Sequence, residues 1–307
     1  MGRERGGLAS ARIAVLNASG ETAVVCDSTG YLPSALVAEH GIQVISLYVS
    51  VDGDQQRETE VEDYGGFFER LRASDGGATT SQPSIGDFLA VYEPLLDAGR
   101  EVVSIHISAG ISGTFEAAGQ ARQRLIDEGK GGERIHLMDS RSAAGGMGLC
   151  ALGAAIAAGG GADAEAAMAR AQEVRRELKM WFAIDTLEYL RRGGRIGGAR
   201  AWIGGALKIK PILTLEEEIT PVERVRTRAR SLERLRGYAR QRHESGADGW
   251  VVQHIQDEET ANKLIEDCYE IYGCDPAFTS EIGAVLGAHV GPGLLGVGGI
   301  PTALLEP

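Results

Sequence analysis

The first half of the chain alternates short apolar runs with segments of helical periodicity. Runs of about four to eight apolar residues predict buried strands, and apolar positions spaced three and four apart predict helices. Strands that alternate with helices form parallel sheets, so this half is expected to be an α/β unit with a mostly parallel sheet and flanking helices. The expected strands are 22–26, 42–50, 101–107 and 135–138, and the expected helices are 61–72, 88 onward, 115 onward and 148–159.

The second half repeats this alternation less regularly and predicts a second α/β lobe. With 307 residues the chain is long enough for roughly two lobes, since single cores stop growing beyond about 250–300 residues. We expect an N-terminal extension at 1–20, a first lobe at 21–170 and a second lobe at 171–307, with an approximate boundary that allows the lobes to exchange segments. The expected elements of this half are helices at about 163–178, 230–244 and 258–271 and strands at 181–185, 210–215 and 250–255.

Two hydroxyl-rich segments lie where helices are expected to begin. They are Thr79–Pro83 and Ser108–Phe115. Helix N-termini offer backbone N–H groups to anions, and ligands of open α/β sheets bind at the carboxyl ends of the strands, so the two segments together predict a site for one negatively charged group. The alternative is that their Ser and Thr side chains only cap helices.

Composition and charge narrow the possible ligands. The formal net charge is -12, from 43 acidic and 31 basic residues, which argues against nucleic-acid binding. The four cysteines and six histidines lack the spacing of a metal site, so no metal is expected. The N-terminal apolar stretch is too short for a signal peptide or a membrane span, which predicts a cytoplasmic protein without stable membrane insertion.

Common catalytic motifs are absent from the sequence. No GxxxxGK[ST] phosphate loop occurs. The segment Gly110–Thr114 resembles a GxSxG nucleophile elbow but ends in threonine, and no carboxylate or histidine is visibly placed to activate Ser112. We therefore expect no catalytic residue in this chain.

Two basic blocks stand out in this acidic chain. One contains Arg191, Arg192 and Arg195, and the other contains Arg224, Arg226 and Arg228. They are either solvated surface charge or a positive patch beside the anion site that docks an acidic partner. His289 lies in a glycine-rich loop and is a further candidate donor at the same site.

Seven motifs in order, over about residues 22–300, carry a resemblance to a known family. They are Val25–Thr29, Thr80–Pro83, Ile107–Thr114, Asp139-Ser140, Asp185–Ile196, Lys208–Pro211 and His289–Gly293. Together they resemble the DegV family. The resemblance implies a two-lobed protein that holds a long-chain fatty acid, such as palmitate, stearate or oleate, between its lobes, and requires no cofactor.

The resemblance also implies roles for particular residues. Thr80 and Ser112 would bind the fatty-acid carboxyl group, supported by Ser81, Gly113 and Thr114. Arg195, Arg226 and His289 would lie at the head-group mouth or engage a partner. That partner would be a separate fatty acid kinase subunit, which forms an acyl-phosphate from ATP.

Three features depart from the family pattern. They are the extension at 1–20, the pair Ala109-Gly110 in the second hydroxyl segment, and the acidic run Glu216–Glu218, which we expect to affect partner docking. The alternative function is a small-substrate enzyme or phosphotransfer-related protein of the dihydroxyacetone-kinase-like fold. A scaffold protein that uses the basic blocks is a third reading, but it leaves the hydroxyl segments without a use.

Overall fold

The computed structural model describes residues 21–74, 77–203 and 209–307, and the expected extension at 1–20 lies outside them. A four-stranded sheet in the order β2-β1-β6-β7 forms the first lobe, and all of its strand pairs are parallel. Its strands are β1 (Thr22–Asp27), β2 (Gln43–Ile45), β6 (Glu101–His106) and β7 (Ile135–Asp139). This confirms the expected parallel sheet.

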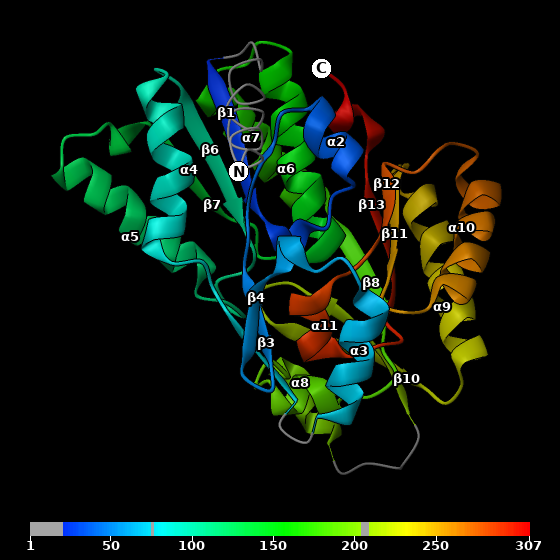
Figure 1. Cartoon of the computed structure of the whole chain (residues 1–307). Coiled ribbons are helices and arrows are strands. Elements are labelled where there is room, and N and C mark those ends of the chain that lie inside the picture. The colour runs from blue at the N-terminus through cyan, green and yellow to red at the C-terminus, as the bar shows by residue number, and fades with distance from the viewer. Residues whose placement is uncertain (1–20, 75–76, 204–208) are drawn as a thin grey trace, which may run out of the picture.

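Helices cover both faces of the parallel sheet (Figure 1). α4 (Ile85–Asp97) and α5 (Thr114–Asp127) pack against one face, where Phe88, Tyr92 and Leu125 are fully buried. α6 (Ala144–Gly159) and α7 (Ala164–Glu177) pack together on the other face. The boundary expected near residue 170 falls inside α7, and the division into 21–170 and 171–307 stays a prediction.

A six-stranded mixed sheet in the order β10-β9-β8-β13-β11-β12 forms the second lobe. Only β11 and β12 run parallel in this sheet. α9 (Arg228–Glu244) and α10 (Glu258–Tyr272) cover its outer face through a shared apolar cluster. Its strands are β8 (Lys179–Ala183), β9 (Lys210–Leu215), β10 (Ile219–Val225), β11 (Gly249–His254), β12 (Phe278–Glu281) and β13 (Leu295–Ile300).

A small antiparallel sheet in the order β4-β3-β5 joins the two lobes. It contains β3 (Tyr48–Val51), β4 (Asp54–Arg57) and β5 (Ala78–Ser81). Although these strands come from the first half, they pack with α3 (Tyr64–Ala73) and with α11 (Ala284–Val290) near the end of the chain. The remaining helices are α2 (Ser34–Glu39) and α8 (Glu188–Arg192).

Two local expectations have different outcomes. Ser84 and Asp87 form the expected reciprocal cap of α4, in which each side chain accepts a hydrogen bond from the other residue's backbone N–H. The single strand expected at 42–50 is wrong, because the chain bends at Ser46-Leu47 and continues in a different sheet. The apolar pattern continues through this bend because both segments are half-buried or buried.

Candidate functional site

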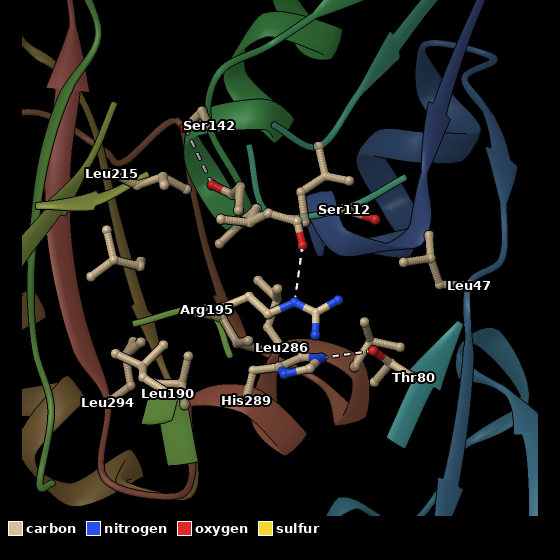
Figure 2. A pocket seen from close by; sticks show the side chains of 18 of the residues that line it. Leu47, Thr80, Ser112, Ser142, Leu190, Arg195, Leu215, Leu286, His289 and Leu294 are labelled. Atoms are coloured by element: carbon tan, nitrogen blue, oxygen red, sulfur yellow. Dashed lines mark hydrogen bonds between the residues drawn. The ribbon is translucent and has the colours of Figure 1, made fainter. Parts of the chain in front are cut away.

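An apolar cavity lies between the two lobes and is lined by both (Figure 2). It contains about 1100 Å³ of space, part of which opens to solvent. The first half contributes the loops after β6 and β7, and the second half contributes β8, β13 and α11. Its apolar wall includes Leu47, Ile107, Ile111, Met180, Phe182, Leu190, Leu215, Ile219, Ile282, Val285, Leu286, Val290 and Leu294.

The polar side chains of this cavity include most of the residues predicted from sequence. Those that line it are Thr80, Ser81, Ser112, Gly113, Arg195 and His289. Thr114 is fully buried behind Ser112 and does not line the cavity. Arg226 is exposed just after β10 and also lies outside the lining. The fold therefore brings together predicted residues from four separate parts of the sequence.

Thr80 reaches the cavity from a strand. It lies in β5 and pairs with Val49 of β3, whereas the next helix begins only at Ile85. The segment therefore joins a strand to a helix, as expected, but its strand belongs to the small antiparallel sheet and not to the parallel sheet. Thr80 is placed by the small antiparallel sheet, which suits a β-branched residue.

Ser112 lies in the loop that leads from β6 of the parallel sheet to α5. Its Oγ lies 2.9 Å from the Thr114 hydroxyl and accepts the Thr114 backbone N–H at 3.3 Å. Gly113 fits beside the Gln82 amide, because a Cβ at position 113 would lie 2.9 Å from both terminal atoms of Gln82. Ser112 therefore has the position at a helix start that the sequence predicted, and the Thr114 hydroxyl lies beside it.

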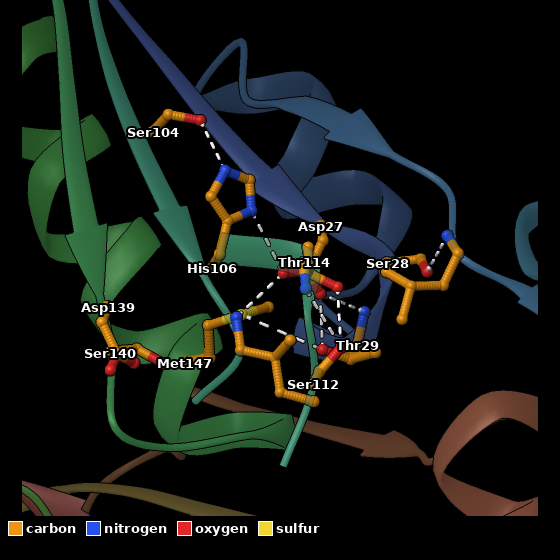
Figure 3. A network of polar contacts seen from close by, with 12 residues as sticks. Asp27, Ser28, Thr29, Ser104, His106, Ser112, Thr114, Asp139, Ser140 and Met147 are labelled. Carbon is orange, nitrogen blue, oxygen red and sulfur yellow. Dashed lines mark hydrogen bonds and ion pairs between the residues drawn. The ribbon is translucent and has the colours of Figure 1, made fainter. Parts of the chain in front are cut away.

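A buried network holds the end of β6, from which the Ser112 loop departs (Figure 3). Asp27 accepts a hydrogen bond from the Ile107 backbone N–H at 2.9 Å and from the Thr29 hydroxyl at 2.5 Å. His106 bridges Asp27 at 3.2 Å and the Ser104 hydroxyl at 2.8 Å. These polar side chains are almost completely buried, so satisfied hydrogen bonds are needed to stabilise them.

His289 contacts Thr80 directly: its Nε2 lies 2.7 Å from the threonine hydroxyl (Figure 2). Burial, followed by the positive charge of Arg195, lowers the pKa of His289 from 6.5 to about 4, so the ring is neutral at pH 7. Its buried Nδ1 has no hydrogen-bond partner among the described residues, and a Cβ at Gly193 would lie only 2.3 Å away.

These contacts favour one tautomer of His289. A buried N–H group without a hydrogen-bond partner costs more free energy than a buried lone pair without one. Because Nδ1 of His289 is the ring nitrogen without a partner, the proton is favoured on Nε2. Nε2–H then donates to the Thr80 oxygen. The Thr80 hydroxyl proton is left to point into the cavity, where it can be donated to an anionic ligand.

Arg195 extends across the same mouth (Figure 2). Its Nε donates to the Ile111 carbonyl at 3.2 Å, and Nη1 donates to the Gly193 carbonyl at 2.6 Å. Because the side chain is exposed and has no ion pair with a carboxylate among the described residues, its charge is available to an anionic ligand or partner.

The acidic run Glu216–Glu218 contacts the first lobe. The Glu217 carbonyl accepts the Ser108 hydroxyl at 2.8 Å, and a Cβ at Gly110 would lie 2.2 Å from the same oxygen. Arg141 pairs with Glu217, and Arg175 pairs with Glu216. This turn thus closes the cavity edge lined by Leu215 and Ile219.

Sequence reasoning missed three polar residues of the cavity wall, Gln82, Ser142 and Gln253. Gln82 belongs to a quoted motif, but Ser142 and Gln253 follow or lie within buried strands and carry no local signal. Within 21–74, 77–203 and 209–307, no group of three or more His, Cys, Asp or Glu residues is placed to hold a metal ion. Over the same residues, no helix is long and apolar enough to cross a membrane.

The fold and cavity define a two-lobed α/β protein with a ligand-sized apolar site between its lobes. A family model described as "Uncharacterised protein, DegV family" matches residues 21–302. Protein DegV of Bacillus subtilis is 35% identical over 278 residues, which cover 90% of this chain and 97% of that protein. A DegV domain-containing protein of Streptomyces coelicolor is 36% identical and covers 91% of this chain and 98% of its own. The chain belongs to the DegV family.

Solved structures agree with this assignment. The crystal structure of DegV from Bacillus subtilis, described as a fatty acid binding protein, has a TM-score of 0.79 and 35% identity and covers 91% of this chain and 99% of that chain. A DegV family protein from Thermus thermophilus, whose structure is described by its fatty acid binding, has a TM-score of 0.81 and 32% identity with the same coverage. The two-lobed fold is therefore shared with relatives that bind fatty acids.

Proposed function

We propose that this protein binds one long-chain fatty acid, such as palmitate, stearate or oleate, in the cavity between its lobes. The observation that carries the proposal is an apolar cavity with hydroxyl groups at its mouth, beside the exposed Arg195, which has no ion pair with a carboxylate among the described residues. In this arrangement Thr80 and Ser112 donate hydrogen bonds to the carboxylate. Ser81, Gly113 and Thr114 support them, and no cofactor is needed.

The two parts of the ligand contribute differently to binding. Each buried methylene contributes roughly 0.8 kcal/mol, so about 14 of them contribute on the order of 10 kcal/mol before the entropy cost of binding. Neutral hydroxyl donors mainly fix the position of the carboxylate. The apolar wall therefore provides the affinity, and Thr80 and Ser112 provide the orientation.

We further propose that the protein presents the bound carboxyl group to a separate ATP-dependent fatty acid kinase. Hydroxyl ligands leave carboxylate lone pairs available to attack a phosphoryl group, and no general base is needed for an ionised nucleophile. Arg195 at the mouth and Arg226, exposed just after β10, are positive groups for partner docking, with His289 holding Thr80. The carrier itself is then not an enzyme, and it acts in the cytoplasm.

Native mass spectrometry of the purified protein, followed by solvent extraction and lipid identification, tests the binding proposal. We expect one fatty acid per chain. A protein that is empty and also fails to take up added palmitate or oleate would contradict the proposal. That result would favour the alternative, a small-substrate enzyme of the dihydroxyacetone-kinase-like fold.

A further inference from the structure

The inner face of β13 has no side chain at two successive inward positions, Gly296 and Gly298. The intervening Val297 faces the opposite side, where it packs in the apolar cluster under α9 and α10. Residues directly opposite each other on adjacent strands share a face, so Gly296 lies in a row between Phe182 of β8 and Gln253 of β11. The three residues of this row all line the cavity.

The two glycines differ in what covers them. A Cβ at Gly298 would lie 2.3 Å from Met180 Cγ, so the Met180 side chain already fills that space. A Cβ at Gly296 would meet nothing closer than Phe182 Cβ at 3.3 Å, so a side chain there would extend into the cavity. Gly296 therefore leaves a slot in the wall between Phe182 and Gln253.

The slot is apolar although Gln253 borders it. The Gln253 Oε1 accepts the Gly145 backbone N–H, and its Nε2 donates to the Ser280 hydroxyl at 2.8 Å. Because both ends of the buried Gln253 amide already have hydrogen-bond partners, the amide does not need a hydrogen bond from a ligand. β13, which begins beside Leu294, lies across the cavity from Thr80 (Figure 2).

We propose that Gly296 is a specificity-determining residue, and that its slot receives the terminal carbons of the acyl chain and sets the longest chain that binds. This inference rests on the proposed function. With the carboxylate fixed at Thr80 and Ser112, the distance from these two residues to β13 limits the length of the acyl chain that fits. A chain that is too long for the slot must either bend or withdraw its carboxylate from the hydroxyl groups.

The test is a titration of saturated fatty acids from laurate to arachidate against the wild-type protein and Gly296→Val. We expect Gly296→Val to bind myristate within about twofold of wild type but stearate at least about tenfold more weakly, because roughly two methylenes lose their burial. Gly296→Ala adds one carbon, 3.3 Å from Phe182 Cβ, which a small shift of Phe182 can accommodate, and it is expected to shift the preference in the same direction by less.

Gly237→Val is the matched control, because Gly237 is exposed on α9 and, apart from the backbone of its own helix, no atom of the described residues lies within 4 Å of an added Cβ. It is expected to leave the chain-length profile unchanged. An equal loss of affinity for all chain lengths in both Gly296 variants, or an unchanged profile in both, would overturn the inference. Absence of binding by the wild-type protein would instead overturn the proposed function, so the two failures are distinguishable.

Discussion

His289 Nε2 lies 2.7 Å from Thr80 Oγ1, although 209 positions separate the two residues in the chain. The contact joins α11 to the small sheet that contains β5. It fixes the Thr80 hydroxyl at the mouth of the cavity, and burial keeps the imidazole neutral. A residue of the second half thus determines the direction in which a donor of the first half points.

A double-mutant cycle measures this coupling. We expect Thr80→Ala and His289→Ala each to weaken palmitate binding, and the double variant to lose less than the sum of the two losses, with a coupling of about 0.5–1.5 kcal/mol. Isothermal titration of the four proteins gives the value. Additive losses, within the usual error of about 0.3–0.5 kcal/mol, would show that His289 acts independently of Thr80.

Ser112→Ala is expected to weaken fatty-acid binding about tenfold while the protein stays folded, because one hydrogen bond to a charged group contributes about 1.5–3 kcal/mol. The binding constant and the midpoint of thermal unfolding are measured together. Thr114→Val is the comparison, since it removes the neighbouring hydroxyl and keeps Ser112. It should have the smaller effect on binding, and unchanged affinity in Ser112→Ala would remove the role of Ser112.

Arg195→Ala is expected to leave fatty-acid binding nearly intact and to slow acyl-phosphate formation with a cognate kinase. The physical reason is that Arg195 lies at the solvent side of the mouth, where a charge contributes more to partner association than to burial of the chain. Arg226→Ala should slow the same reaction without any change in binding, since Arg226 does not line the cavity. Equal turnover in the presence of the kinase would contradict both roles.

The buried carboxyl group of Glu58 is expected to make the free energy of unfolding depend on pH. Its carboxylate is buried and accepts hydrogen bonds from Ser28 Oγ at 2.5 Å, Tyr31 Oη at 2.5 Å and the Val285 backbone N–H at 2.8 Å. Burial raises the pKa of Glu58 from 4.5 to about 7, against the opposing effect of these donors. The folded state therefore binds this proton more tightly than the unfolded state, and the resulting stabilisation is lost as the pH rises from about 4.5 through 7.

Comparison with Glu58→Gln isolates this contribution. Relative to wild type, the free energy of unfolding of Glu58→Gln should increase by up to about 3 kcal/mol between pH 4.5 and pH 8. Denaturant unfolding over this range provides the measurement. His289 acts in the opposite direction in both proteins, because its lowered pKa costs stability as the pH falls from 6.5 towards 4, and it cancels in the comparison. A constant difference between the two proteins would contradict the shifted pKa of Glu58.

The sequence by itself determined the parallel sheet, the cap at Ser84 and the family. These follow from local properties, because alternating apolar runs, a Ser–Asp pair three residues apart and ordered motifs are readable without knowledge of distant contacts. It also identified Thr80, Ser112, Arg195 and His289, which the structure places around one cavity. These four residues were predicted from the sequence motifs that contain them and not from the apolar periodicity of the chain.

Only the tertiary structure decided how those residues meet. The placement of Thr80 depends on the pairing of β5 with β3, which joins positions at least 27 apart in the chain, and on the packing of both strands against α11 from the end of the chain. The slot at Gly296 exists because Met180 covers Gly298 and leaves its neighbour open, which is a property of cross-strand packing. Gly296 and Gly298 are the same residue type in the same strand. Only the residues packed across from each glycine determine whether it leaves open space in the cavity wall.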